Sequence, residues 1–361
     1  MQTDSTATGD SVIKSGSKLA CRRNADLAEF TTLGLGGPSR SLIRVDSAEQ
    51  AVQAMRQALA DDEAVLVLAG GSNVVIGDAG FAGTTILLRS RGIAILGEGR
   101  DGVSVRAAAG HRLDELVAWT VDGSLAGIEC LSGIPGSVGA TPIQNVGAYG
   151  QEIADVLSHI TVYDRELDRV VELTAADCGL AYRTSALKGS SRYLVLDVTL
   201  RLRRDDCGGP LRYGELTRRL GDDLRPPLKQ VRRTVLELRR GKGMVIDPND
   251  PDTRSVGSFF TNPVVDEALL ERIGGDDDVP HWTQPDGRMK LAAAWLIEHA
   301  GFTKGYQAGG VGISSKHTLA LVNRGGTTGE LVEFARTIRA EVFRRYGVRL
   351  DPEPVFVAER L

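Results

Sequence analysis

The sequence is poor in cysteine, and its four cysteines, Cys21, Cys130, Cys178 and Cys207, form no CxxC pair. Their wide spacing argues against both a zinc site and a disulfide framework, because each needs thiols in a recognisable arrangement. The five histidines show no HExxH or other paired spacing. We therefore predict no metal site, and a reducing cytoplasm as the environment of the protein.

Long apolar runs are also absent from the sequence. No segment approaches the roughly twenty apolar residues that cross a bilayer, so we predict no contact with a membrane. Residues 1–18 are rich in Ser, Thr, Asp and Gly and lack the apolar stretch of a secretion signal. We predict that they form a disordered tail.

Neither sign of charge dominates the composition. The chain of 361 residues has 43 Lys and Arg against 47 Asp and Glu, for a formal net charge of −4. Because no long block of basic residues is present, we predict no nucleic-acid partner. The length is enough for two or three domains with a sizeable core.

The common nucleotide-binding motifs are missing. No GxxxxGK[ST] phosphate loop occurs, and Gly34-Leu35-Gly36-Gly37 does not extend to GxGxxG. Both a P-loop protein and a Rossmann dinucleotide-binding domain are therefore disfavoured.

What the chain does contain is a glycine-rich segment from Leu131 to Gly150, with five glycines and two prolines. Glycine allows positive φ angles and close approach of a ligand to the main chain, while proline stiffens the path between glycines. A flexible linker would be more polar than this segment, in which Ile134, Val138 and Val146 are apolar. We predict an ordered loop that faces a ligand.

A second glycine turn, Gly70-Gly71-Ser72-Asn73, directly follows a predicted buried strand over Ala64 to Leu68. Successive backbone N–H groups in such turns form anion-binding nests that suit a pyrophosphate. Taken alone, this turn is more typical of an ordinary strand-to-helix connection than of a phosphate contact. The two glycine-rich segments together favour a phosphate-containing ligand.

The apolar periodicity predicts a mixed order of helices and strands. Between Arg239 and Pro263 the composition shifts to Gly, Asp, Pro and Ser, which indicates a domain boundary or an active-site loop. The predicted helices span residues 47–59, 113–121, 228–238, 291–299 and 328–346, and the further predicted strands span 103–107, 194–202 and 319–322.

Six motifs, in this order, carry a resemblance to a known family. They are Thr32 to Pro38, Gly70 to Asn73, Gly127 to Gly150, Ala181-Tyr182-Arg183-Thr184-Ser185, Gly257-Ser258-Phe259-Phe260-Thr261-Asn262-Pro263 and Asp351-Pro352-Glu353. From about residue 27 to its end, the chain resembles the UDP-N-acetylenolpyruvoylglucosamine reductases. Each motif is common by itself, whereas the ordered set is specific.

The resemblance implies an α+β fold: a two-part FAD-binding module of the vanillyl-alcohol oxidase type and a smaller α/β substrate-binding domain. The implied divisions are 19–88 and 89–238 for the two FAD-binding subdomains and 239–349 for the substrate-binding domain. A final segment, 350–361, would carry a catalytic glutamate.

The resemblance also implies an NADPH-dependent flavin reductase, a UDP-N-acetylmuramate dehydrogenase. Such an enzyme converts UDP-N-acetylglucosamine enolpyruvate to UDP-N-acetylmuramate in peptidoglycan synthesis, and so serves cell-wall formation, cell shape and cell division. Hydride passes from reduced FAD to the enolpyruvyl methylene carbon, and a proton follows. No histidine or cysteine stands in a covalent-flavin motif, so we expect noncovalent FAD. We expect a monomer.

Three residues are the catalytic candidates that the resemblance implies. Arg183 would stabilise the negative charge that spreads into the substrate carboxylate, because a guanidinium stays protonated and can form two parallel hydrogen bonds. Ser258 would donate the proton, and Glu353 would assist protonation or orient the substrate. Outside their motifs, these residues would be interpreted as a surface ion pair, a loop serine and a turn residue.

The resemblance further implies two sets of binding residues, and the sequence departs from the family pattern near one of them. An acidic insertion, Asp247 to Asp252, follows Lys242, and Thr261 stands where a lysine is common. The implied substrate contacts are Tyr182, Tyr213, Lys242 and Asn262, with Tyr213 over the UDP diphosphate and Lys242 as a point charge for the phosphates. The implied FAD contacts are Gly70, Gly71, Ser72, Asn73, Ser132, Gly133, Ile134, Pro135, Gly136, Gly139, Ala140, Asn145, Gly147, Ala148 and Tyr149.

Two other functions remain open. One is a flavin oxidase of the same fold that oxidises a carbohydrate or alcohol with oxygen. The other is a noncatalytic nucleotide-binding or regulatory protein. The catalytic candidates in their motifs argue against both, and the sequence shows no DNA-binding module.

Overall fold

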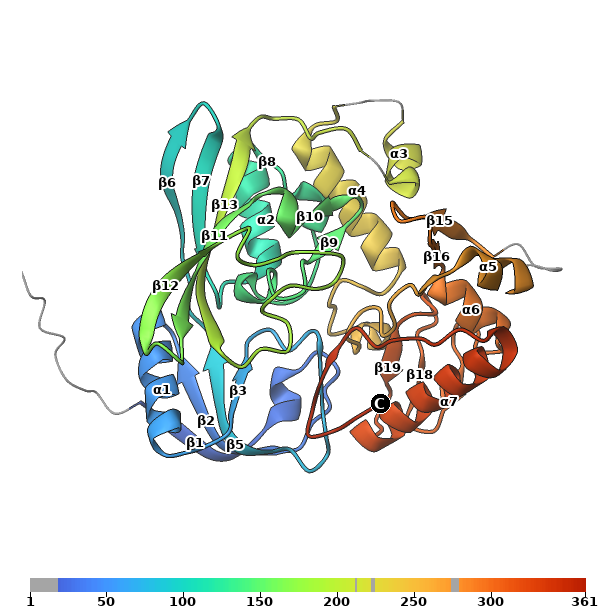
Figure 1. Cartoon of the computed structure of the whole chain (residues 1–361), viewed down its shortest axis with the longest axis horizontal. Helices are drawn as coiled ribbons and strands as arrows, with labels where there is room; N and C mark the ends of the chain where they lie inside the picture. The colour runs from blue at the N-terminus through green and yellow to red at the C-terminus, as the bar shows by residue number, and fades with distance from the viewer. Residues whose placement is uncertain (1–18, 212, 222–224, 274–278) are drawn as a thin grey trace, which may run out of the picture.

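The computed structural model describes residues 19–211, 213–221, 225–273 and 279–361 (Figure 1). The predicted disordered tail, residues 1–18, lies outside these ranges.

The first sheet is mostly parallel and is covered by helix α1, Ala48–Ala60. Ser47 caps this helix, since its hydroxyl accepts a hydrogen bond from the Gln50 N–H, and the predicted helix over 47–59 is confirmed. In spatial order the strands are β1 (Cys21–Asp26), β2 (Pro38–Val45), β5 (Phe81–Leu88) and β3 (Val65–Leu68), with only β1 antiparallel to its neighbour.

The second sheet is antiparallel, and helices α2 (Leu113–Asp122) and α4 (Leu228–Gly241) lie beside each other next to it (Figure 1). The two sheets share one core, to which Ile86 of the first sheet and Val105 of the second both belong. The main strands, in spatial order, are β12 (Arg169–Thr174), β11 (Leu157–Asp164), β13 (Tyr193–Arg204), β7 (Gly102–Ala108) and β6 (Ile93–Gly99), and the short β8 (Leu125–Ala126) pairs with β13.

The predicted elements of this sheet are confirmed, with longer bounds than the periodicity indicated. Strand β13 contains the predicted strand 194–202. Helix α4 continues past the predicted end at 238 to Gly241, so Arg239 and Arg240 lie in its last turn. The segment 131–150 contains only short elements, including a turn of 3-10 helix at Val138–Ala140 and the two-residue strand β9, Gly147–Ala148, as its glycine content predicts.

The C-terminal part forms a separate core that also includes Leu33 and Val75 from the N-terminal part. Thr327 and Glu330 form a capping box at the start of its longest helix, and Gly347 ends it with φ of +67°. Its helices are α5 (Glu267–Ile273), α6 (Ala293–His299) and α7 (Thr328–Tyr346). Its two small sheets contain β14 (Val264–Val265), β16 (Met289–Leu291) and β15 (His281–Thr283), and β17 (Gln307–Ala308), β18 (Val311–Ile313) and β19 (Leu321–Asn323).

Helix α6 begins two residues later than the predicted start at Leu291. Leu291 instead pairs with His281 across β16 and β15. The Asn262 side-chain oxygen then accepts a hydrogen bond from the Ala293 N–H at 3.0 Å and satisfies the first turn of the helix.

The end of the chain returns to the N-terminal part. Strand β20, Val355–Val357, pairs in parallel with β4, Val74–Ile76, with Val355 opposite Val74. Because β4 begins directly after Asn73, this pairing brings the segment around Glu353 to the first glycine turn.

Candidate active site

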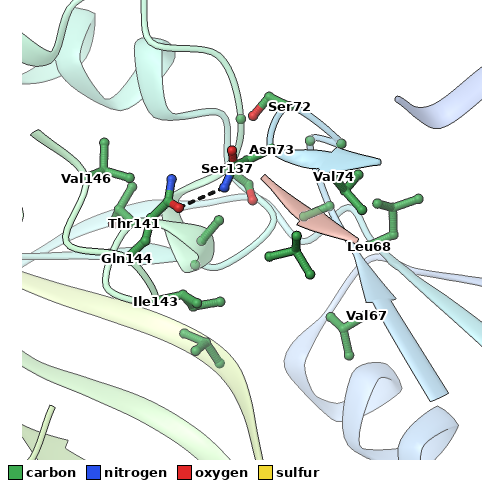
Figure 2. Close-up of a pocket in the computed structure, with 18 of the residues that line it drawn as sticks. Val67, Leu68, Ser72, Asn73, Val74, Ser137, Thr141, Ile143, Gln144 and Val146 are labelled. Carbon is green, nitrogen blue, oxygen red and sulfur yellow. Dashed lines mark hydrogen bonds between the residues drawn. The ribbon is translucent and has the colours of Figure 1, made fainter. Parts of the chain in front are cut away.

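The two glycine-rich segments face each other across one cavity of about 570 Å³. Figure 2 shows Ser72 and Asn73 on one side of it and Thr141, Ile143 and Gln144 on the other. Strand β3 forms part of the wall, and its Val67 is 39% exposed. The prediction that residues 64–68 form a buried strand is therefore wrong for Val67, because this side chain borders the cavity and not the core.

The segments touch through glycines. A Cβ on Gly70 would lie 2.5 Å from the Gly136 Cα, and a Cβ on Gly136 would lie 2.6 Å from the Ser72 hydroxyl oxygen. That hydroxyl donates a hydrogen bond to the Pro135 carbonyl at 3.1 Å. Only residues without side chains allow the two turns to meet here and present their backbone to the cavity.

We expect Gly70→Ala to separate the two turns and weaken FAD binding. Overpacking of this kind costs about 1–3 kcal/mol, which corresponds to a loss of affinity of roughly 5- to 150-fold if the cost falls on the bound state. The dissociation constant of FAD, followed by flavin fluorescence, measures the effect. Gly97→Ala is the matched control, because no atom lies within 4 Å of the added Cβ. Equal FAD affinity in both variants would show that the contact between the turns is unimportant.

Asn73 joins three segments at the edge of the cavity. Its side-chain N–H₂ donates to the Gln144 side chain at 2.8 Å, the bond drawn in Figure 2, and to the Glu353 carbonyl at 3.4 Å. Its own carbonyl accepts from the Val355 N–H at 3.0 Å. The glycine turn thus positions both the second glycine segment and the strand that follows Glu353.

The structure brings Arg183, Ser258 and Glu353 together, because all three line this cavity. The Arg183 Nε lies 3.1 Å from the Glu353 Oε1. The other guanidinium nitrogens donate to the carbonyls of Gly147 at 2.9 Å and Asn145 at 3.4 Å. Arg183 has φ of +53°, an uncommon value for a residue with a side chain. The surrounding contacts therefore hold this arginine in one position.

Glu353 lies in an environment suited to holding a proton. Its side chain is 16% exposed. Burial raises the pKa of its carboxyl above the usual range, and the positive charges of Arg183 and Lys188 act in the opposite direction. Such a carboxyl takes up a proton closer to neutral pH than an exposed glutamate does.

Ser258 is held by the backbone on both sides. Gly257 has φ of +74°, and its N–H donates to the Ser255 hydroxyl at 3.2 Å. The next residue, Phe259, is fully buried, and its N–H donates to the Leu319 carbonyl at 2.8 Å. The Phe259 carbonyl accepts from the Glu353 N–H at 2.9 Å, which fixes the serine loop to the C-terminal segment.

The predicted FAD contacts fall into two groups. The residues that line the cavity are Gly70, Gly71, Ser72, Asn73, Ile134, Pro135, Gly136, Gly139, Ala140 and Gly147. Ser132, Gly133, Asn145, Ala148 and Tyr149 are outside this lining set. Asn145 instead supports the site, since its side chain is bonded to Glu152 and the Ala181 carbonyl while its own carbonyl accepts from Arg183.

Two predicted substrate contacts, Tyr213 and Lys242, meet in a separate cluster. The Lys242 Nζ lies 2.5 Å from the Glu215 carboxylate, on helix α3 (Gly214–Leu220), and 5.8 Å from the centre of the Tyr149 ring. The rings of Tyr149 and Tyr213 meet edge to face with centres 5.1 Å apart. A cation with aromatic rings around it can receive a phosphate and a base.

The other two predicted substrate contacts lie elsewhere. The Tyr182 ring is 45% exposed and has cations near it, the Lys290 Nζ at 4.8 Å and the Arg183 guanidinium at 5.6 Å from its centre. Asn262 uses its side-chain oxygen to cap helix α6, which leaves the amide N–H₂ for another partner.

Several lining residues were not found from the sequence. Gln144, Ser137 and Lys188 line the cavity, as does Arg239 in the last turn of α4. Gln144 and Ser137 lie within the glycine-rich segment and could have been included with it. The sequence pattern did not mark Arg239 as a site residue, because adjacent arginines are common at the end of a helix.

The residues present fit FAD. A cavity of about 570 Å³ with two glycine turns and mostly apolar walls is typical of a cofactor site. The Ser137 hydroxyl is buried at the edge of the cavity without a hydrogen-bond partner among the described residues, so a polar group of a ligand can satisfy it.

In the described part of the chain, no cluster of three metal-ligating side chains occurs, and all four cysteines are free. No helix among the described residues is long and apolar enough to span a membrane.

Comparison with known proteins agrees with this geometry. Residues 39–174 match the FAD binding domain family, and residues 248–357 match the C-terminal domain of UDP-N-acetylenolpyruvoylglucosamine reductase. Reductases of that name from Salinispora arenicola and Thermobifida fusca are 53% and 50% identical, over 92% and 94% of this chain and 94% and 98% of their own lengths.

A solved structure supports the fold. The crystal structure of UDP-N-acetylenolpyruvylglucosamine reductase from Thermus caldophilus has a TM-score of 0.63 and 24% identity, and covers 94% of this chain and 99% of its own. The predicted fold class, an FAD-binding module with a smaller second domain, is confirmed. The chain therefore belongs to the UDP-N-acetylenolpyruvoylglucosamine reductases, a family of FAD-dependent oxidoreductases.

Proposed function

We propose that this protein reduces UDP-N-acetylglucosamine enolpyruvate to UDP-N-acetylmuramate with NADPH as the electron donor. The observation that carries the proposal is the convergence of Arg183, Ser258 and Glu353 on the cavity lined by the FAD turns. These three residues come from distant parts of the chain. An arginine can stabilise the charge that develops when an enolpyruvyl double bond is reduced, and a hydroxyl with a nearby carboxyl can supply the proton.

Arg183 stabilises the charge that develops during reduction. Bound FAD, once reduced, supplies the hydride to the methylene carbon. Negative charge then spreads into the substrate carboxylate, and the Arg183 guanidinium faces it as a fixed cation. Its contacts with Glu353, Gly147 and Asn145 orient it before the substrate binds, so little reorganisation is needed.

Ser258 donates the proton to the carbon next to the carboxylate. A serine hydroxyl is a weak acid, but the enolate-like carbon is strongly basic and the serine loop is fixed in place. Glu353 assists, since its raised carboxyl pKa favours a proton on this side of the cavity. Phe259 and Phe260, both buried, help to keep water from the reacting carbon.

Lys242 and Tyr213 bind the UDP diphosphate, with Tyr182 and Asn262 nearer the enolpyruvyl group. Lys242 is 30% exposed while paired with Glu215, so a diphosphate can approach it. The ligand then competes with the Glu215 carboxylate for the same ammonium group.

We expect Glu215→Gln to bind UDP up to about 5-fold more tightly, because a partly exposed ion pair of this kind contributes about 0.2–1 kcal/mol. Titration calorimetry with UDP, at fixed ionic strength, measures the change. Glu237→Gln on the exposed face of α4 is the matched control. Weaker binding in Glu215→Gln would show that Glu215 positions Lys242 instead of competing for it.

We further infer that the enzyme acts as a monomer in the cytoplasm. One chain supplies all three catalytic side chains to the cavity, so no second copy is needed to complete it. Four free cysteines, two of them buried, suit a reducing compartment.

Product analysis tests the proposed reaction. Incubation of the protein with NADPH and UDP-N-acetylglucosamine enolpyruvate should yield a product that has gained two hydrogen atoms, visible by mass spectrometry. In deuterated water, one deuterium should enter at the carbon next to the carboxylate. Unchanged substrate alongside peroxide formation would favour a flavin oxidase instead.

A further inference from the structure

Arg239 is a buried cation without a matching anion among the residues that the structure describes. It lies in the last turn of helix α4, is 9% exposed and lines the FAD cavity. One terminal nitrogen donates to the Met244 carbonyl at 2.9 Å, but the Nε is buried without a hydrogen-bond partner. The guanidinium thus has unused donors at the cavity.

The anionic groups around Arg239 are already engaged or uncharged. Asp114 forms two hydrogen bonds with the Arg232 guanidinium, at 2.6 and 3.0 Å, and a third with the Gly133 N–H. Burial raises the pKa of the nearby Tyr149 phenol to about 12, so it remains neutral near pH 7. In the described part of the chain, no carboxylate forms an ion pair with Arg239.

A buried guanidinium in this state is costly to the protein alone. Burial lowers the pKa of Arg239, yet a guanidinium still remains protonated in proteins. An unpaired buried charge is strongly unfavourable unless another group supplies the opposite charge. Since Arg239 lines the cavity, that group is expected to come from the ligand.

Position favours the cofactor over the substrate as the source of this charge. A Cβ on Gly133 would lie 3.5 Å from the Arg239 Nε, so the guanidinium lies against the glycine-rich segment 131–150. The phosphate-binding candidate Lys242 is instead paired with Glu215 beside Tyr213. Arg239 lines the cavity with the glycine turns, whereas Lys242 and Tyr213 are outside its lining set.

We propose that Arg239 is the counter-cation for a negative charge carried by bound FAD. The inference rests on the FAD-binding assignment and does not depend on the proposed substrate. FAD has two sources of such charge: the diphosphate, present in both redox states, and the ring, which becomes anionic on reduction. Both are acceptors for a buried guanidinium.

The test compares Arg239→Met with Arg240→Met, which removes an exposed arginine next to it. Arg239→Lys is the rescue variant, because it keeps the charge. FAD dissociation constants are measured by flavin fluorescence on dilution of each holoenzyme, and midpoint potentials by anaerobic titration. Thermal melting shows whether each variant is folded.

We expect Arg239→Met to bind FAD about 10–100-fold more weakly in at least one redox state, as for loss of a hydrogen bond to a charged group. Equal loss in both states identifies the diphosphate. Loss only in the reduced state identifies the ring and lowers the two-electron potential by about 30 mV per tenfold. Arg239→Lys should recover part of the loss, and Arg240→Met should match the parent.

Two results would overturn the proposal. One is parental FAD affinity and potential in a folded Arg239→Met variant. The other is unchanged FAD binding with weakened UDP binding, which would make the substrate the partner of Arg239. If Arg239→Met does not fold, Arg239→Gln still decides, because it keeps hydrogen-bond donors but removes the charge, and parental FAD affinity and potential in both redox states would contradict the counter-cation role.

Discussion

Replacing Ser258 by alanine is expected to lower turnover by about 10²–10⁴-fold while FAD binding and flavin reduction by NADPH remain. The hydroxyl traps the reduced substrate by protonating it, and without this step hydride transfer to the substrate reverses. Its loss should therefore slow the second half-reaction alone. Rapid-mixing experiments that follow flavin absorbance separate the two halves: reduction by NADPH, then reoxidation by the enolpyruvyl substrate.

Ser255→Ala is the control for disturbance of the same loop. The Ser255 hydroxyl accepts from the Gly257 N–H at 3.2 Å, so this variant loosens the loop without removing the proposed proton donor. It should affect thermal stability more than turnover. Parental turnover in Ser258→Ala would remove Ser258 from its proposed role, and an equal loss in Ser255→Ala would reduce that role to loop structure.

Arg183→Lys is expected to lose about 10²–10³ in turnover, although the charge is kept. The guanidinium contacts Glu353 through one nitrogen and the carbonyls of Gly147 and Asn145 through the others. A lysine ammonium is a single point and cannot hold this orientation and also grip a carboxylate with two parallel hydrogen bonds.

The same rapid-mixing experiment measures the Arg183→Lys effect. Reduction of FAD by NADPH should stay close to the parent rate, whereas reoxidation by the substrate should slow. Arg22→Lys, at an exposed arginine paired with Glu29, controls for the substitution itself. A reoxidation rate equal to the parent's would contradict the bidentate role of Arg183.

Much of the fold could be predicted because local patterns determine it. The periodicity of residues 328–346 predicts helix α7 with the bounds that the structure has, and Thr327, Glu330 and Gly347 form its capping box and its end. The glycine content of residues 131–150 likewise predicts a ligand-facing loop, and this segment lines the cavity. These features depend on neighbours in the sequence, which a sequence pattern records directly.

The site depends on contacts that no local pattern records. Arg183 and Glu353 meet because β20 pairs with β4 and because Asn73 bonds to the segment before β20. Only the ordered set of motifs could indicate that arrangement in advance.

Burial of single side chains was harder still to predict. Arg239 and Arg240 are chemically identical neighbours, and only the packing of α4 buries the first at the cavity and exposes the second. Val67, in a strand that was predicted to be buried, is 39% exposed and lines the cavity.

We propose that bound flavin passes electrons from NADPH to the enolpyruvyl substrate, and one anaerobic experiment shows whether it does. The visible absorbance of the purified holoenzyme is bleached with NADPH, and UDP-N-acetylglucosamine enolpyruvate is then added. Rapid return of the oxidised flavin band is the predicted result. A band that stays bleached with this substrate and returns only when oxygen is admitted would contradict the account and favour an oxidase.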